Sequence, residues 1–337
     1  MSESTIPLYT ERYTAPSWLP GGNIQTLYPY FNKPAQLFMY RRERWELDDG
    51  DFIDVDWTDG SADSPLVIFF HGLEGDSSSH YILSMINSLR TYHWRSAVIH
   101  FRGCSGVPNR LARAYHAGDS AEIDWMLRRV INQMPAACAT QPVYVMGVSL
   151  GGNALLKWLG EQGEAALNLV SRAAGVSAPV DLAAAGHALD SGFNRHVYTA
   201  RFLSTLKAKG LRKAALFPAL LDADAIRAAT TFQEFDTLVT ARLHGFVDAE
   251  DYWLKVSSKP WLKLIRVPTL VLNARNDPFL PAEALPGSDE VSDVVTLEQP
   301  DTGGHVAFPS GPFPGNALWL PQRLLRHFDH FIGAFKD

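Results

Sequence analysis

The sequence reads VYVMGVSLGGN at residues 143–153, and this stretch holds the only Gly-x-Ser-x-Gly pattern of the chain, centred on Ser149. An apolar run of strand length precedes the serine, and a segment with helical spacing of apolar residues follows it. A serine between such a strand and helix lies on a sharp, strained turn, so the residues two positions before and after it must be small. The context therefore favours a nucleophilic serine over a turn that merely needs glycine.

Short apolar runs recur on both sides of this turn, and segments with helical spacing separate most of them. The runs lie at 65–70, 96–101, 143–148, 172–177, 267–272 and 293–298, and the helical segments at 80–92, 119–133, 152–162 and 316–334. This alternation indicates a parallel sheet covered by helices on both faces. A hairpin of residues 38–47 and 51–57, turning at Asp49-Gly50, raises the expected number of strands to eight. We expect an α/β protein with the α/β-hydrolase fold and a mostly parallel eight-stranded sheet.

Two segments are expected to stand outside this alternation. Residues 1–37 form an N-terminal arm, whose part rich in Pro, Gly and aromatic residues (15–34) is expected to lie extended on the body. Residues 181–261 are rich in Ala and Leu, and we expect an all-helical cap over one end of the sheet. The hydrolase core then comprises 38–180 and 262–337.

A serine hydroxyl is a weak nucleophile near neutral pH, so it needs a base and a group that orients the base. In this fold the order along the chain is Ser, then Asp or Glu, then His. Six histidines follow Ser149, and among them His305 lies in a glycine-containing loop after the last predicted strand. The helical segment 181–261 contains His187, His196 and His244. The closing helix contains His327 and His330, which we expect to be surface residues.

The expected acid is Asp277, in NARNDPF at 273–279, because it closely follows a predicted strand. Its rivals lie before that strand or too close to His305 in the sequence: Asp248, Asp251 and Asp301. An Asp before Pro is by itself a common turn former. What favours a site is the coincidence of Ser149, Asp277 and His305, each after a strand and in the required order.

The motif HGLEG at 71–75 follows another predicted strand. Acyl transfer needs backbone N–H groups aimed at the place where a negative oxygen forms. One such donor in this fold is the residue after the nucleophile, here Leu150, and the other comes from the loop after the third strand. We select the amide of Leu73 as this second donor, with Gly72 as the alternative. A glycine-rich turn without any donor role is the interpretation without function. We expect His71 to be a structural hydrogen-bonding residue rather than a second base.

Composition restricts the partners and the location. The net charge of −6 and the absence of a polybasic segment argue against nucleic acid and anionic lipid as partners. Two cysteines, Cys104 and Cys138, lack metal-ligand spacing and fit a cytoplasmic protein; Cys104 is expected to be a small buried side chain. The first residues show no secretory pattern, and no apolar stretch is long enough to span a bilayer, so we expect no stable membrane insertion. The oligomeric state stays open.

Five motifs taken together resemble one family: HGLEG at 71–75, HFRGCSG at 100–106, GVSLGGN at 147–153, NARNDPF at 273–279 and GGH at 303–305. The combination is similar to the YheT-like hydrolases of bacteria, which are related to plant and animal abhydrolase-domain proteins. The resemblance extends from about residue 15 to the end of the chain. It implies a Ser–Asp–His triad, matching Ser149, Asp277 and His305, and an esterase or lipase activity.

These expectations define a serine hydrolase that cleaves short- or medium-chain carboxylic esters through an acyl-enzyme. Ser149 attacks, His305 moves the proton, and Asp277 orients His305, while the amides of Leu73 and Leu150 hold the oxyanion. The expected partner is a small-molecule acyl ester, and no metal or organic cofactor is expected. Two alternatives stay open: a thioesterase or acyltransferase that uses the same three residues, and a non-catalytic ligand-binding member of the fold.

Overall fold

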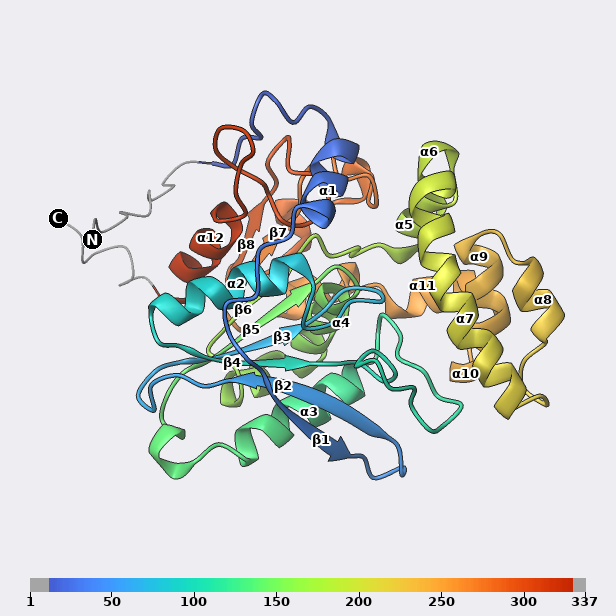
Figure 1. Cartoon of the computed structure of the whole chain (residues 1–337), viewed down its shortest axis with the longest axis horizontal. Helices are drawn as coiled ribbons and strands as arrows, with labels where there is room; N and C mark the ends of the chain where they lie inside the picture. The colour runs from blue at the N-terminus through green and yellow to red at the C-terminus, as the bar shows by residue number, and fades with distance from the viewer. Residues whose placement is uncertain (1–11, 330–337) are drawn as a thin grey trace.

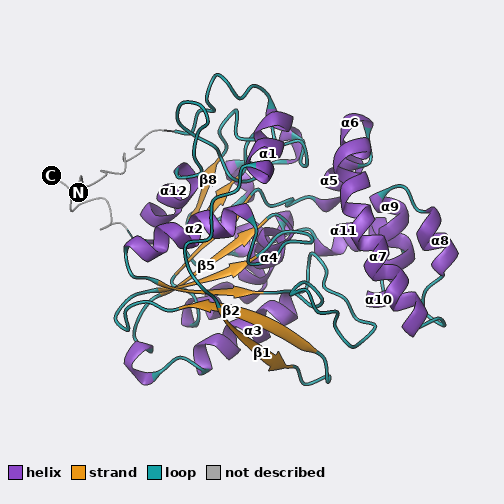
Figure 2. Ribbon diagram, in the orientation of Figure 1, coloured by secondary structure: helices purple, strands orange, loops and turns teal. Residues whose placement is uncertain are grey.

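The computed structural model describes residues 12–329. One sheet of eight strands, in the order β1-β2-β4-β3-β5-β6-β7-β8, forms its centre (Figures 1 and 2). The strands are β1 (Arg41–Glu46), β2 (Phe52–Thr58), β3 (Leu66–Phe70), β4 (Arg95–Ile99), β5 (Val143–Val148), β6 (Arg172–Val176), β7 (Thr269–Leu272) and β8 (Val295–Glu298). The pairs β1–β2 and β2–β4 are antiparallel, and the other pairs are parallel. The predicted hairpin and the mostly parallel α/β-hydrolase sheet are confirmed.

Helices cover both faces of this sheet. They are α2 (His80–Thr91) and α12 (Trp319–Phe328) on one face, with α3 (Ser120–Asn132) and α4 (Leu150–Gln162) on the other. Every residue of β3 and of β5 is buried. That burial explains why these strands are continuous apolar runs without alternation.

Between β6 and β7 the chain forms a group of helices, which we call the insertion (residues 181–261). Its helices are α5 (Leu182–Leu189), α6 (Gly192–Asn194), α7 (Ala200–Leu216), α8 (Ala223–Ala228), α9 (Phe232–Phe235), α10 (Arg242–His244) and α11 (Ala249–Val256). They lie together at the right of Figure 1, with a small apolar core that includes Leu203, Ile226 and Phe235. The all-helical expectation for this stretch is confirmed, and its role as a cap stays a prediction. Within residues 12–329, no helix combines the length and the apolar character that crossing a bilayer requires.

Two expectations from the sequence are wrong. Residues 15–34 are not extended throughout, because Gly22–Phe31 form helix α1. This helix contains Pro29 and has no side-chain cap, so tertiary contacts rather than helix propensity hold it. His327 is not a surface residue but is buried, and its Nε2 lies 2.9 Å from the carbonyl oxygen of Ala173. His330 and residues 1–11 lie outside the described residues.

A buried network of charges ties the β1–β2 hairpin to the rest of the sheet. The guanidinium of Arg102 donates to Glu122 Oε1 at 2.6 Å, to Asp49 Oδ2 at 2.8 Å and to Asp51 Oδ2 at 3.0 Å. Asp51 is fully buried and also accepts a hydrogen bond of 2.6 Å from Asn109 Nδ2. Asp51 and Glu122 are shielded from water and therefore depend on their protein partners, whereas the side chain of Asp49 is 39% exposed.

We predict that Arg102→Met lowers the free energy of unfolding by about 3–5 kcal/mol, because Asp51 and Glu122 would be left buried without their cation. Urea unfolding of the purified variant measures this change. The matched control is Arg128→Met, which removes a surface pair with Asp124 and should cost less than about 1 kcal/mol. Equal losses in the two variants would contradict the prediction.

Candidate active site

Ser149 lies at the apex of the turn between β5 and α4. Its backbone is left-handed, with φ +52° and ψ −122°, and its amide donates to the carbonyl oxygen of Val176 at 2.9 Å. A Cβ on Gly147 would lie 2.4 Å from the carbonyl oxygen of Gly151, and a Cβ on Gly151 would lie 2.5 Å from that of His71. Both positions therefore require glycine, because a side chain would not fit. The serine lies on the resulting tight turn, directly before the first turn of α4.

The structure brings Ser149, His305 and Asp277 together. His305 Nε2 lies 3.0 Å from Ser149 Oγ, and His305 Nδ1 lies 2.8 Å from Asp277 Oδ2. Asp277 and His305 are both buried. Both distances are those of hydrogen bonds, so the imidazole can take the hydroxyl proton while the carboxylate holds the opposite ring nitrogen.

Helix α1 supports the loops that carry His305 and Asp277. Thr26 Oγ1 accepts the backbone hydrogen bond of His305 at 2.9 Å. Gln25 Oε1 accepts from the amide of Gly303 at 2.9 Å and from Asn276 Nδ2 at 3.0 Å. The sequence analysis did not identify these roles of Gln25, Thr26 and Asn276, although Asn276 lies in the NARNDPF motif at 273–279. The one signal available in the sequence was that Asn276 directly precedes the expected acid Asp277.

Phe279 is a further residue at this site. Its ring stacks on the imidazole of His305, with ring centres 4.0 Å apart and planes at 27°. Its amide donates to Asp277 Oδ1 at 2.8 Å. The residue therefore covers one face of the histidine and also holds the second carboxylate oxygen, so that Asp277 keeps a fixed orientation.

The turn Gly72–Gly75 lies next to Ser149. The amide of Gly72 donates to the hydroxyl of Tyr81 at 2.9 Å, which disfavours Gly72 as an oxyanion donor. The Gly72 carbonyl oxygen accepts from the amide of Gly75 at 3.0 Å. The Gly72 carbonyl and the Leu73 N–H belong to the same trans peptide and point in opposite directions. The hydrogen bond to the Gly72 oxygen therefore also fixes the direction of the Leu73 N–H. Within residues 12–329 no acceptor is found for the amides of Leu73 and Leu150, and both residues line the same cavity as Ser149.

His71 also holds the Gly72–Leu73 peptide. Its Nε2 accepts from the amide of Phe101 at 3.1 Å, so Nδ1 carries the hydrogen and donates it to the Gly72 carbonyl oxygen at 2.8 Å. The side chain is fully buried, and burial lowers the pKa of His71 to about 3. His71 is therefore a neutral structural residue, as expected, and not a second base.

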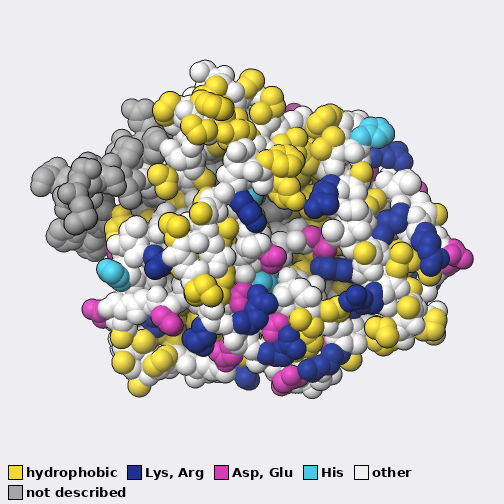
Figure 3. All heavy atoms as spheres, viewed as in Figure 1, with side chains coloured by type: hydrophobic (Ala, Val, Ile, Leu, Met, Phe, Trp, Pro, Cys, Tyr) yellow, Lys and Arg dark blue, Asp and Glu magenta, His cyan; other side chains and the backbone are white. Residues whose placement is uncertain are grey.

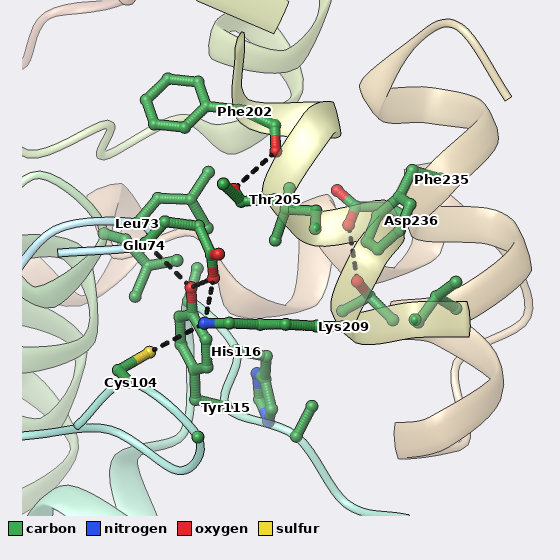
Figure 4. A pocket seen from close by; sticks show the side chains of 18 of the residues that line it. Leu73, Glu74, Cys104, Tyr115, His116, Phe202, Thr205, Lys209, Phe235 and Asp236 are labelled. Carbon is green, nitrogen blue, oxygen red and sulfur yellow. Dashed lines mark hydrogen bonds and ion pairs between the residues drawn. The ribbon is translucent and has the colours of Figure 1, made fainter. Parts of the chain in front are cut away.

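A cavity of about 620 Å³ lies between the sheet and the insertion, and it reaches Ser149 and His305. Much of its wall is apolar, and the insertion supplies side chains that include Leu189, Phe202, Phe232 and Trp253. The part drawn in Figure 4 also contains polar groups, among them Glu74, Cys104, Tyr115 and Lys209. Burial raises the pKa of Cys104 to about 12, which keeps this thiol protonated at neutral pH. The size and the mixed lining are those of a small-molecule site.

Comparison with known proteins agrees with this architecture. Residues 65–312 match the family described as the alpha/beta hydrolase fold. Among solved structures, an esterase of Pyrococcus furiosus, Pf2001, superposes with a TM-score of 0.52 at 15% identity, covering 88% of this chain and 90% of the other. At that identity the likeness concerns the fold alone. The fold, the turn at Ser149 and this match define the chain as an α/β hydrolase.

Closer relatives refine the classification. YheT of Escherichia coli (strain K12), whose name describes a candidate esterase, is 36% identical over 307 residues, which is 90% of this chain and 88% of YheT. Human phospholipase ABHD3 is 28% identical over 340 residues, which is 98% of this chain and 81% of that protein. The chain therefore belongs to the YheT-like α/β-hydrolase family.

Four buried or half-buried histidines predict sensitivity to acid. Burial lowers the pKa of His71, His116 and His244 to about 3 and that of His80 to about 4. In the unfolded chain the same side chains bind protons near pH 6.5. The unfolded state therefore binds more protons below about pH 6.5, and the free energy of unfolding falls as the pH drops from there towards 4.

Urea unfolding at a series of pH values measures this dependence. His244→Gln should reduce the slope between about pH 6.5 and 4 by up to about 1.4 kcal/mol per pH unit, because one titrating group is removed. His196→Gln is the control, since His196 is exposed, and it should leave the slope unchanged. If His244→Gln also left the slope unchanged, the prediction would be wrong.

Proposed function

We propose that this chain is a serine hydrolase that cleaves carboxylic esters with short- or medium-chain acyl groups. The observation that carries the proposal is the pair of hydrogen bonds of His305, whose Nε2 accepts from Ser149 Oγ at 3.0 Å and whose Nδ1 donates to Asp277 Oδ2 at 2.8 Å. This arrangement lies beside a largely apolar cavity, on a fold shared with relatives of the esterase and lipase type. A non-catalytic member of the fold would have no need of a serine, a base and an acid in this order and geometry.

In the first half of the reaction, His305 Nε2 takes the hydroxyl proton as Ser149 Oγ bonds to the ester carbonyl carbon. The carbonyl oxygen becomes an anion, to which the amides of Leu73 and Leu150 donate hydrogen bonds. The bond to the alcohol oxygen then breaks, and the leaving alkoxide takes the proton from His305. The acyl group stays on Ser149.

In the second half, His305 takes a proton from a water molecule as the water oxygen attacks the acyl carbon. The bond to Ser149 Oγ breaks, the serine regains its proton from His305, and the carboxylic acid leaves. Asp277 accepts the Nδ1 hydrogen throughout and stabilises the imidazolium that exists between the steps. Phe279, stacked on the ring, keeps water from one face of it.

The cavity supports an ester with an apolar acyl part, because the insertion contributes aliphatic and aromatic side chains beside Ser149. The name of the relative ABHD3, a phospholipase, makes glycerophospholipids a second class of ester to test. Thioesters, or transfer to another alcohol, would use the same three residues with a different leaving group or acceptor. Assays with phospholipids, with thioesters and with a competing alcohol acceptor distinguish these alternatives.

We predict that a fluorophosphonate probe labels the wild-type protein and that Ser149→Ala abolishes labelling. Ser149→Ala and His305→Ala should each lower kcat for a nitrophenyl ester by about 10⁴-fold or more, and Asp277→Asn by a similar factor, because the tautomer is lost. Circular dichroism of each variant controls for folding. A wild type that neither labels nor hydrolyses would favour the ligand-binding interpretation.

The length of the acyl group should determine how well an ester is hydrolysed. Nitrophenyl esters of increasing chain length should give kcat/KM values that rise to a maximum at short or medium length and then fall, because the cavity has a limited volume. Thioester analogues, phospholipids and a competing alcohol acceptor belong in the same panel. A preference for charged acyl groups, or for thioesters over esters, would contradict the proposed substrate.

A further inference from the structure

Helix α7 of the insertion carries five basic residues and no acidic one: Arg201, Lys207, Lys209, Arg212 and Lys213. Figure 3 shows basic side chains gathered over this part of the molecule. Two of them bridge to the core. Lys213 Nζ donates to Asn109 Oδ1 and to the carbonyl oxygens of Leu111 and Arg113, whereas Lys209 Nζ donates to Glu74 Oε1 at 2.7 Å. Lys209 alone of this pair reaches the turn that carries Leu73.

The carboxylate of Glu74 lies almost out of contact with solvent, its side chain being 10% exposed. Its Oε1 accepts from the hydroxyl of Tyr115 at 2.8 Å as well as from Lys209, and that hydroxyl accepts from the Glu74 amide at 3.0 Å. Figure 4 shows Lys209 extending from its helix towards Glu74, Tyr115 and Cys104. The ammonium is therefore the positive partner that a carboxylate in this position requires.

Glu74 also has an unusual backbone. Its φ is +55°, a left-handed conformation that costs a residue with a Cβ about 1–2 kcal/mol. Residues 72–75 form a turn in which the amide of Gly75 bonds to the carbonyl oxygen of Gly72, and a left-handed residue at the third position fits such a turn. The conformation of Glu74 is thus part of what fixes the Gly72–Leu73 peptide.

We propose that Lys209 is a positioning residue for the oxyanion hole. Its ion pair with Glu74 holds the backbone of residue 74 left-handed, which closes the turn and aims the Leu73 amide at the developing negative oxygen. The inference rests on the proposed function, since it assigns Lys209 a part in the same reaction. Because Lys209 belongs to the insertion and Glu74 to the core, the donor is fully aimed only while α7 is docked.

The test is a double-mutant cycle between Lys209→Met and Glu74→Gly, with kcat and KM measured on the nitrophenyl ester that the wild type hydrolyses best. Lys209→Met should lower kcat by about tenfold with little change in KM, since a misaligned donor loses part of the 10²–10³-fold that a deleted one costs. Lys209→Arg keeps the charge and should restore most of kcat. Glycine adopts positive φ without support, so Glu74→Gly serves as the reference background, and its own kcat and KM are measured first.

The decisive comparison is the effect of Lys209→Met in the two backgrounds. We expect the tenfold loss in the Glu74 protein and almost none in the Glu74→Gly protein, because glycine no longer needs the ion pair. Lys213→Met is the matched control. It weakens contact between the same helix and the core without reaching the turn, so whatever it costs should be equal in both backgrounds.

An equal loss from Lys209→Met in both backgrounds would show that Lys209 acts independently of Glu74, and it would overturn the inference. A kcat of Glu74→Gly alone as low as that of Lys209→Met would show that the ion pair serves docking rather than the backbone of residue 74, and it would overturn the inference as well. An active wild type with no loss of kcat in Lys209→Met would overturn it as well, while leaving the proposed function intact. A wild type without hydrolysis and without fluorophosphonate labelling would instead overturn the proposed function, and the positioning role with it.

Discussion

The close approach of helix α4 to the end of strand β3 is the constraint on which the site depends. A Cβ on Gly151 would lie 2.6 Å from the carbonyl oxygen of Phe70 and 2.5 Å from that of His71, so only glycine lets the two segments meet. Strands β3 and β5 are neighbours in the sheet, and their carboxyl ends deliver the Gly72–Gly75 turn and Ser149 to the same place. Both proposed oxyanion donors follow from that contact.

The same region concentrates backbone strain. Seven described residues other than glycine have positive φ, and six of them belong to the loops that form the site: Glu74, Ser149, Ser177, Val306, Ala307 and Phe308. Each such conformation costs of order 1–3 kcal/mol and persists only where neighbouring contacts enforce it. Here the enforcing contacts are specific: the Val306 amide donates to Ser177 Oγ at 3.0 Å, and Glu74 has Tyr115 and Lys209. The rest of the fold thus stabilises a site that is locally unfavourable.

Local patterns were enough to predict the sheet and most of its helices, because strand period and glycine spacing can be recognised in neighbouring residues. They also selected Ser149, Asp277 and His305, which the structure brings together and whose catalytic roles stay a proposal. Helix α1 escaped prediction because Pro29 and the surrounding aromatic residues are typical of an irregular segment, and because hydrogen bonds to residues far along the chain help to stabilise it. The selection of Leu73 over Gly72 had no support in the local pattern, because the observation that favours it is the hydrogen bond from the Gly72 amide to the hydroxyl of Tyr81. Contacts between distant charges such as Lys209 and Glu74 leave no periodic trace.

The hydrogen bonds of helix α1 also determine when this site can exist during synthesis. Gln25 and Gly303 are 278 positions apart, and Thr26 and His305 are 279 apart. A nascent chain contains the residues of helix α1 and of the serine turn long before it contains the histidine loop, so the contacts that stabilise this helix come late. The complete hydrogen-bonded set can form only after residue 305 has been synthesised, so the proposed site is assembled later than the strands and helices that precede it.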